Sequence, residues 1–462
     1  MLGILYILLG IALAVSIIIT FKKRIISSSI IIESGLFVYY VLPNLRHIYS
    51  NSGNFISRYE HFYGTNAEPT ILGFVCVLTF YFFFKFSNIL KVDNGIIQKY
   101  IPNEQKKIIK LSIYITTFSI LTFVLYASLF GGVMNVFKSI SDIRAGFVST
   151  KTGQFDFLNK LYRVAPFALF ITADYLRSTK AHKIVLVNYV VAFLIAISTG
   201  GRGLMLQMFI ILVMGKALKI RKRIKIKYII LLIFGFVFFI VLYRPLIISS
   251  QYLSSNGLVY VWSRFISEVT QSSKYNITSI GNTFSSLLDS FEHYQVSLET
   301  SLRVVNDGTH APNLFMEIIY SIISIVPSKL LGITKPPTIT YYNSMYLSGV
   351  PNLIQVPSGI IAAAYYSGGL LWVSIYAVLI GVIGKKIDRF YLKIKDHVKF
   401  SNTYYVAILF FYFGFAIGGD LATAFQKGLT TFPVLYIINK QLKPFDYKKS
   451  VCNVKYVASK EV

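Results

Sequence analysis

Two arginines stand where an apolar chain is expected to pass from a membrane into water. Arg202 lies in AISTGGRGLMLQMF (196–209), among three glycines and between two apolar runs. It follows Lys183 by 19 residues, which is about 28 Å at the rise of an α-helix. Since the hydrocarbon core of a bilayer is about 30 Å thick, Arg202 is predicted at its border. The glycines would let a ligand approach the backbone there.

Arg244 repeats the arrangement in VLYRPLI, 17 residues after Lys227 and directly before Pro245. That separation is about 26 Å in a helix, so both arginines reach a similar depth, and the proline loosens the helix end. Planar guanidinium groups match phosphate oxygens and bind them well where water is scarce. The pair therefore predicts a phosphate clamp, although arginines near helix ends also extend to lipid headgroups.

A general base is the next requirement, and His310 in DGTHAPN is the first candidate because imidazole titrates near neutral pH. The alternative is a solvated loop histidine. We take Arg202, Arg244 and His310 as the candidate catalytic residues. Five further residues are candidates for substrate binding, although each could be an ordinary paired or solvated loop charge: Arg144, Arg264, Arg303, Glu317 and Asp420.

Two other kinds of residue allow alternative interpretations. Glu33, inside an apolar run, could couple a proton or could be bonded to neighbouring helices. Tyrosines and Trp262 between residues 250 and 358 could stack on sugar rings, or could mark the membrane interface.

The motifs of several enzyme classes are missing from the sequence. It has no phosphate-loop pattern, no HExxH, no CxxC and no paired aspartates that could hold a metal against a nucleotide sugar. We therefore expect neither a cofactor nor a metal. Two isolated cysteines also exclude a disulfide framework.

The composition places these residues in a membrane protein. Of 462 residues, 55% are hydrophobic and only 14% are charged, which is too apolar for a water-soluble domain. The net charge of +27 arises from Lys and Arg clusters between apolar runs, so it indicates membrane topology and no nucleic-acid partner.

Eleven apolar segments approach the roughly 20 residues that a spanning helix needs. They predict an all-α, polytopic membrane protein with one large extracytoplasmic loop between helices 8 and 9. The predicted spans are 3–21, 25–42, 69–90, 111–130, 162–178, 184–199, 204–220, 228–249, 360–383, 401–419 and 423–439.

Counting through these spans puts every basic cluster on one side, which the positive-inside rule makes cytoplasmic. The N-terminus is then outside and the C-terminus inside. We divide the chain into a membrane bundle (1–249), the long external segment (250–358) and the last three helices with a basic tail (359–462). Within the external segment we expect an amphipathic helix and a re-entrant or interfacial helix at 314–326, which Pro327 ends.

The chain resembles the O-antigen polymerase (Wzy-type) repeat-unit polymerases in three features. These are the predicted layout, TGGRG at an outer turn, and VPSGIIAAAYYSGGLLWVSIYAVLIGVIGKKI (356–387). The resemblance covers most of the chain in architecture and two short stretches in sequence. Where members often carry a glutamate in the late motif, this chain has Ala362, Ala363 and Ala364, which removes one candidate catalytic carboxylate.

The resemblance implies a metal-independent glycosyltransferase in the bacterial inner membrane. It would move a growing glycan from polyprenyl diphosphate onto a lipid-linked repeat unit at the outer face, making O-antigen or capsule. Arg202 and, more loosely, Arg244 would bind the diphosphate. Its partners would be the polyprenyl-diphosphate-linked oligosaccharide, membrane lipid, and the flippase and chain-length regulator of the same pathway. The alternatives are an O-antigen ligase, and a flippase or transporter of the lipid-linked oligosaccharide.

Overall fold

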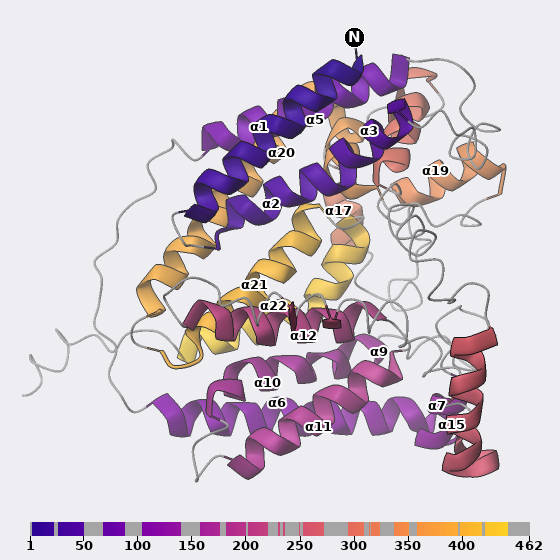
Figure 1. The fold of residues 1–462 in the computed structure, drawn as a ribbon, viewed down its shortest axis with the longest axis vertical. Helices are drawn as coiled ribbons and strands as arrows, with labels where there is room; N and C mark the ends of the chain where they lie inside the picture. Colours follow the sequence, from indigo (N-terminus) through magenta and orange to yellow (C-terminus); the bar gives the residue numbers. More distant parts are fainter. Residues whose placement is uncertain are drawn as a thin grey trace, which may run out of the picture.

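The structure is a computed structural model, and its described residues form helices, turns and short connections, with no strand among them (Figure 1). The described residues are 2–22, 26–49, 68–87, 104–139, 158–175, 182–199, 202–219, 230–231, 234–235, 249, 253–271, 294–308, 314, 316–323, 337–350, 358–395, 398–417 and 421–441.

One group of helices surrounds the largest hydrophobic core. Figure 1 shows its long members running nearly side by side, and α5 and α20 are in extensive contact. The group consists of α1 (Leu2–Lys22), α2 (Ser28–Leu36) with its π-helical continuation η1 (Phe37–Val41) and α3 (Leu42–Tyr49), α5 (Glu68–Ser87), α20 (Gly359–Ile394) and α21 (Ser401–Ala416).

A second group packs around two further apolar clusters. It joins the first group through α21, which contacts α12 and α10, and the Thr403 hydroxyl donates to Asp174 at 3.3 Å. Its members are α6 (Glu104–Ser128), α9 (Leu158–Leu161), η3 (Tyr162–Val164), α10 (Ala165–Thr172), η4 (Ala173–Tyr175), α11 (His182–Ser198) and α12 (Arg202–Lys219). Further described helices are α7 (Val133–Lys138), α15 (Leu253–Gln271), α17 (Met316–Ile323), α19 (Ile339–Ser348) and α22 (Leu421–Gln441), and residues 294–306 are also helical.

The outer faces of several helices are apolar, as in a protein surrounded by lipid. Ile4 of α1 is 61% exposed and Leu121 of α6 is 59% exposed. By length and hydropathy four described stretches can cross a membrane: Gly3–Thr20, Ser28–Leu45, Lys106–Ser128 and Gly359–Ile394. Shorter apolar helices cover Ile71–Ser87, His182–Ser198 and Leu204–Leu218. The number of eleven spans and the loop layout remain predictions.

Some helix boundaries differ from those predicted. The span 228–249 lies mostly outside the described residues. The span 360–383 is part of a longer helix, because α20 continues through the basic stretch to Ile394. Within α20, Gly369 has φ +73 and interrupts the regular helix, a conformation that glycine adopts without steric cost.

The ends of α2, α20 and α21 meet at two places, one at each end of the bundle that they form. At what we call the Asp388 end, Asp388 near the end of α20 bonds Ser28 at the start of α2 and Tyr405 near the start of α21. At the Gly359 end, Gly359 at the start of α20 lies beside Tyr40 and Ile417. This antiparallel arrangement matches the alternating direction of the predicted spans. In the predicted topology the Asp388 end is cytoplasmic.

Glu33 illustrates how polar groups fasten these helices. It is fully buried on α2 and forms an ion pair with Lys85 of α5. The Lys85 ammonium also donates to Ser16 of α1 at 2.6 Å, and Ser29 donates to Glu33 at 2.6 Å. Of the two interpretations of Glu33, the structure supports the carboxylate bonded to neighbouring helices.

Candidate functional site at the Gly359 end

Part of the long segment before α20 is built into the bundle core. Residues 294–306 are helical, and Leu298 and Leu302 within them are fully buried. A Cβ at Gly73 of α5 would lie 3.5 Å from Gln295 and 3.8 Å from Leu302, so this helix packs closely on α5. The predicted external segment therefore contributes to the main core.

Gly359 marks the point where four segments converge. Its φ is +64, in the region that favours glycine. A Cβ there would lie 2.9 Å from the Tyr40 hydroxyl, 3.3 Å from the Ile417 carbonyl oxygen and 3.4 Å from Cδ1 of Tyr294. Any larger residue would be strained and would press on the Tyr40 hydroxyl.

Buried hydroxyl groups with unused bonding capacity lie at this junction. Tyr40 and Ser358 are fully buried, and neither hydroxyl has a hydrogen-bond partner within the described part of the chain. Leaving such a group unsatisfied costs about 1–3 kcal/mol, and buried polar groups are nearly always bonded. Two of them beside Gly359 therefore suggest a position for a ligand or water.

Further polar contacts, which we call the polar rim, lie at the other end of the helical residues 294–306 from Tyr294. The Tyr346 hydroxyl of α19 donates to Asp307 at 2.6 Å, and the Tyr365 hydroxyl of α20 donates to Asn306 at 3.0 Å. Burial raises the pKa of Tyr346, the hydrogen bond and negative charge of Asp307 raise it further, and Arg303 opposes the rise. Tyr346 therefore stays protonated at neutral pH and can donate a hydrogen bond.

The rim is held in place by buried polar contacts between α19 and the helical residues 294–306. Asn343 of α19 donates to the Ser297 hydroxyl at 3.1 Å, and Ser301 donates to Asn343 at 3.2 Å. The Thr338 hydroxyl caps α19 by accepting from the Tyr341 amide at 3.3 Å, and Gly349 ends the helix in the left-handed conformation. These bonds fix the position of Tyr346 relative to Asp307.

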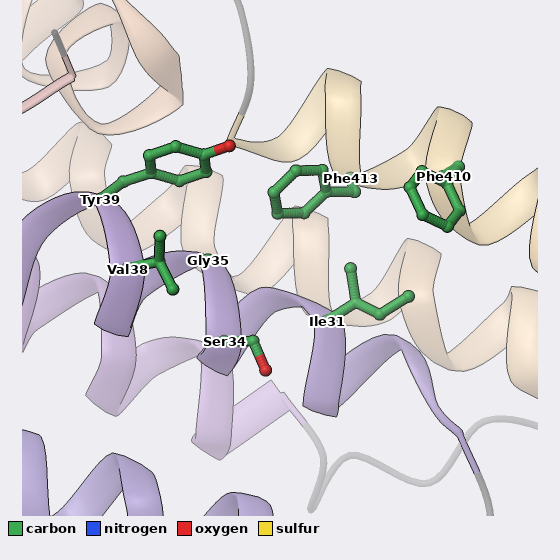
Figure 2. Close-up of a pocket in the computed structure, with 7 residues that line it drawn as sticks. All are labelled: Ile31, Ser34, Gly35, Val38, Tyr39, Phe410 and Phe413. Carbon is green, nitrogen blue, oxygen red and sulfur yellow. The ribbon is translucent and has the colours of Figure 1, made fainter. Parts of the chain in front are cut away.

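An apolar groove runs between α2 and α21 toward the same junction. Figure 2 shows the rings of Phe410 and Phe413 facing Ile31 and Val38 across it. Its volume is about 300 Å³, and its lining consists of Ile31, Ser34, Gly35, Val38, Tyr39, Phe410 and Phe413. A Cβ at Gly35 would lie 2.7 Å from Cε2 of Phe413, so glycine is required for this close approach.

Tyr39 joins the groove to the Gly359 junction. Its ring meets the Tyr294 ring edge-on, with centroids 4.5 Å apart, and lies 6.0 Å from the Phe413 ring. Tyr294 in turn contacts the Gly359 position. The groove and the buried hydroxyls thus adjoin through Tyr39 and Tyr294. The polar rim at Asn306 lies about 18 Å farther along the helical residues 294–306.

The predicted site residues fall into four groups. Arg303 lies at the polar rim, close to Tyr346. Arg264 is elsewhere, on α15, where its Nη2 pairs with Oε1 of Glu268 at 2.9 Å. For Arg202, at the start of α12, and Glu317, in α17, only the backbone is described.

Arg144, Arg244, His310 and Asp420 lie outside the described residues, although Asp420 directly precedes α22. Sequence reasoning missed Tyr40, Ser358, Asn306, Asp307 and Tyr365. For Asn306 and Asp307 a signal existed, because residues three and four positions after Arg303 share its helix face.

The chain matches no protein-family model, no curated protein and no solved structure. What the site can do must therefore be argued from its own residues.

Proposed function

We propose that the protein is a polysaccharide polymerase of the O-antigen polymerase (Wzy) type. It would transfer a growing glycan from polyprenyl diphosphate to a lipid-linked repeat unit at the outer face of a bacterial inner membrane. The observation that carries this proposal is an apolar groove that adjoins buried hydroxyls at Gly359, with a polar rim farther along the helical residues 294–306. A lipid-linked sugar has the same division into apolar and polar parts.

The groove suits a section of a hydrocarbon chain. Phe410, Phe413, Val38 and Ile31 provide apolar walls. Its volume of about 300 Å³ is at the lower end of the range of about 300–1,000 Å³ for small-molecule sites. It therefore has room for part of one isoprenoid chain beside the bundle, while the rest of the chain stays in lipid.

The polar part suits a carbohydrate. Sugars present many hydroxyls, which need neutral donors and acceptors together with flat apolar faces. The Gly359 junction offers the Tyr40 and Ser358 hydroxyls, and the rim offers Asn306, Asp307 and Tyr346.

The transfer needs a cation, an acceptor and a base. The acceptor hydroxyl oxygen bonds to the anomeric carbon, the bond from that carbon to the diphosphate breaks, and its electron pair stays on the leaving phosphate. Arg202 and Arg244 are proposed to bind the diphosphate, with Arg303 as a further cation on the described rim. The proton of the acceptor passes to a base, for which we propose His310 first and Glu317 second.

The test compares two arginines of the same long segment, Arg303 and Arg264. A polymerase-deficient strain that makes the matching lipid-linked unit would express wild type, Arg303→Ala, Arg202→Ala or Arg264→Ala, and surface glycan would be resolved on a gel. We expect a ladder from wild type and Arg264→Ala. We expect at least about a hundredfold less polymer from the other two at equal protein level, because a cation that stabilises developing charge is lost.

Other outcomes would contradict parts of the proposal. Single units from every protein, wild type included, would reject the polymerase. Accumulation of the lipid-linked unit inside the cell when the protein is absent would indicate a flippase, and a change in attachment without a change in length would indicate a ligase. A normal ladder from Arg303→Ala would keep the function and remove Arg303 from the site.

A further inference from the structure

The helix α15 (Leu253–Gln271) differs in direction from the long helices. Figure 1 shows it at the end of the molecule where α6 is followed by α7, with its axis lying across that of α6. In the predicted topology this end of α6 is the outer one. A helix that crosses the ends of membrane-spanning helices lies near the level of the bilayer surface.

After the break at Gly257 (φ +76), the exposed surface of α15 is mainly apolar, with Ser263 as an exposed polar residue. Val259 is 86% exposed, Trp262 62% and Ile266 46%. Their spacing of three and four residues places them on one face of the helix. In water this arrangement would be unfavourable, because three large apolar side chains would all be solvated.

The charged residues of α15 lie on the opposite face. Arg264 and Glu268 form an i,i+4 ion pair at 2.9 Å and are less exposed than the apolar face. At about 100° per residue, they lie roughly opposite Trp262 and Ile266. The helix is therefore amphipathic with its apolar side turned outward, which is the reverse of a helix on a water-soluble protein.

The neighbouring surface at this end of α6 is also apolar. Leu125, near the end of α6, and Met134, on α7, are both more than half exposed. Gly131 and Gly132 have φ +80 and +121 in the turn between the two helices. An exposed apolar belt thus continues from the side of α6 onto α7, at the end of the bundle where α15 lies.

We propose that α15 is a membrane-surface helix that inserts Val259, Trp262 and Ile266 into the boundary between lipid headgroups and acyl chains. The amphipathic ring of tryptophan favours this boundary. The helix would lie in the plane of the outer leaflet, as interfacial amphipathic helices do. The proposal stands independently of the polymerase assignment, because it depends only on the bilayer as partner.

The chain contains two tryptophans, Trp262 and Trp372, which makes a direct measurement possible. Trp372→Phe leaves Trp262 as the only tryptophan in the full-length protein. This variant would be placed in phosphatidylcholine nanodiscs that carry a spin label either high or deep on the acyl chain. We expect at least about twofold stronger quenching of Trp262 by the shallow label than by the deep one, and protection from aqueous iodide.

Each other pattern would overturn the proposal. Quenching by iodide without quenching by lipid would place Trp262 in water. Stronger quenching by the deep label would place it in a membrane span, and no quenching by either agent would place it against protein. Trp262→Phe, which leaves Trp372 of α20, is the matched reference for a tryptophan of the helix bundle.

A second pair of variants tests whether the apolar face is responsible. Ile266→Asp should reduce the quenching by the shallow label by at least half, whereas Glu268→Gln on the opposite face should leave it unchanged. Equal quenching in both variants would contradict an insertion that depends on this face.

Discussion

The two ends of the bundle formed by α2, α20 and α21 differ in whether their buried polar groups are hydrogen-bonded. At the Asp388 end, Asp388 accepts from the Ser28 amide at 3.0 Å, from the Ser28 hydroxyl at 2.8 Å and from Tyr405 at 2.6 Å. The Tyr405 ring also stacks on Tyr391 with centroids 3.9 Å apart. At the Gly359 end, the buried hydroxyls of Tyr40 and Ser358 have no such partners within the described residues.

Because of this difference, we expect the Asp388 end to contribute stability and the Gly359 end to contribute binding capacity. A fully bonded polar network fixes one arrangement of its helices, so the Asp388 end sets how the three helices meet. Hydroxyls that no group of the described residues satisfies cost stability but remain available to a ligand. The groove also reaches the Gly359 end through Tyr39, which makes it the end where function is expected.

The largest predicted effect concerns the ion pair that fastens α5 to α2. Lys85→Met leaves the buried Glu33 carboxylate without its cation, and we expect a loss of about 3 kcal/mol or more in the free energy of unfolding. The double variant Glu33→Gln with Lys85→Met should recover most of the lost unfolding free energy. Unfolding by SDS in detergent micelles measures both, and an unchanged Lys85→Met protein would contradict the role given to this pair.

The same substitution at the two ends tests the comparison directly. Tyr405→Phe removes a hydrogen bond to a buried carboxylate and should cost about 1–3 kcal/mol of unfolding free energy. Tyr40→Phe removes a hydroxyl that has no such bond among the described residues, so its stability should equal or exceed that of wild type while the glycan ladder shortens. Equal destabilisation by the two variants would break the contrast between the ends.

Two helix glycines provide a packing test. At Gly384, near the Asp388 end, a Cβ would lie 2.6 Å from the Tyr412 hydroxyl and 2.7 Å from the Ser28 hydroxyl. Gly384→Ala should therefore cost about 1–3 kcal/mol through overpacking. At Gly414, near the Gly359 end, nothing lies within 4 Å, and Gly414→Ala should stabilise the helix by about 0.5–1 kcal/mol. Thermal unfolding in one detergent ranks the two, and the opposite order would contradict the tight packing at Gly384.

The smallest expected effect is that of the partly exposed ion pair on α15, whose side chains are 42% and 23% exposed. Arg264→Ala breaks an i,i+4 ion pair at the surface, which is worth about 0.3–0.5 kcal/mol. The unfolding free energy should fall by no more than that. A drop several times larger would show that Arg264 has a structural role beyond this pair.

Apolar segments of the sequence predicted where most helices lie, because helix length and hydropathy are local properties. The segments 3–21 and 401–419 correspond closely to α1 and α21, whereas α6 begins seven residues before the predicted span 111–130. The insertion of residues 294–306 into the core could not be predicted in this way. It depends on contacts with α5 and α20, which lie far away in the sequence.

The candidate site was predicted only in part, for a similar reason. Arg303 was singled out because a charge is visible in the sequence, whereas Tyr40 and Ser358 look like ordinary residues at the edges of apolar segments. Their importance arises only in the fold, which buries both hydroxyls and places the Tyr40 hydroxyl at Gly359, the residue after Ser358. Arg264 was chosen on the same grounds as Arg303, and the structure places it in a local ion pair instead.

The π-helical turn η1 (Phe37–Val41) has a consequence for how this protein can evolve. Its wider turn contains both Tyr39, which lines the groove, and Tyr40, which reaches Gly359. Deleting one residue here would restore a regular α-helix and rotate everything on one side of the turn by about 100° relative to the other. Groove and junction would then lose their alignment in a single step, so insertions and deletions in this turn should be far less tolerated than substitutions.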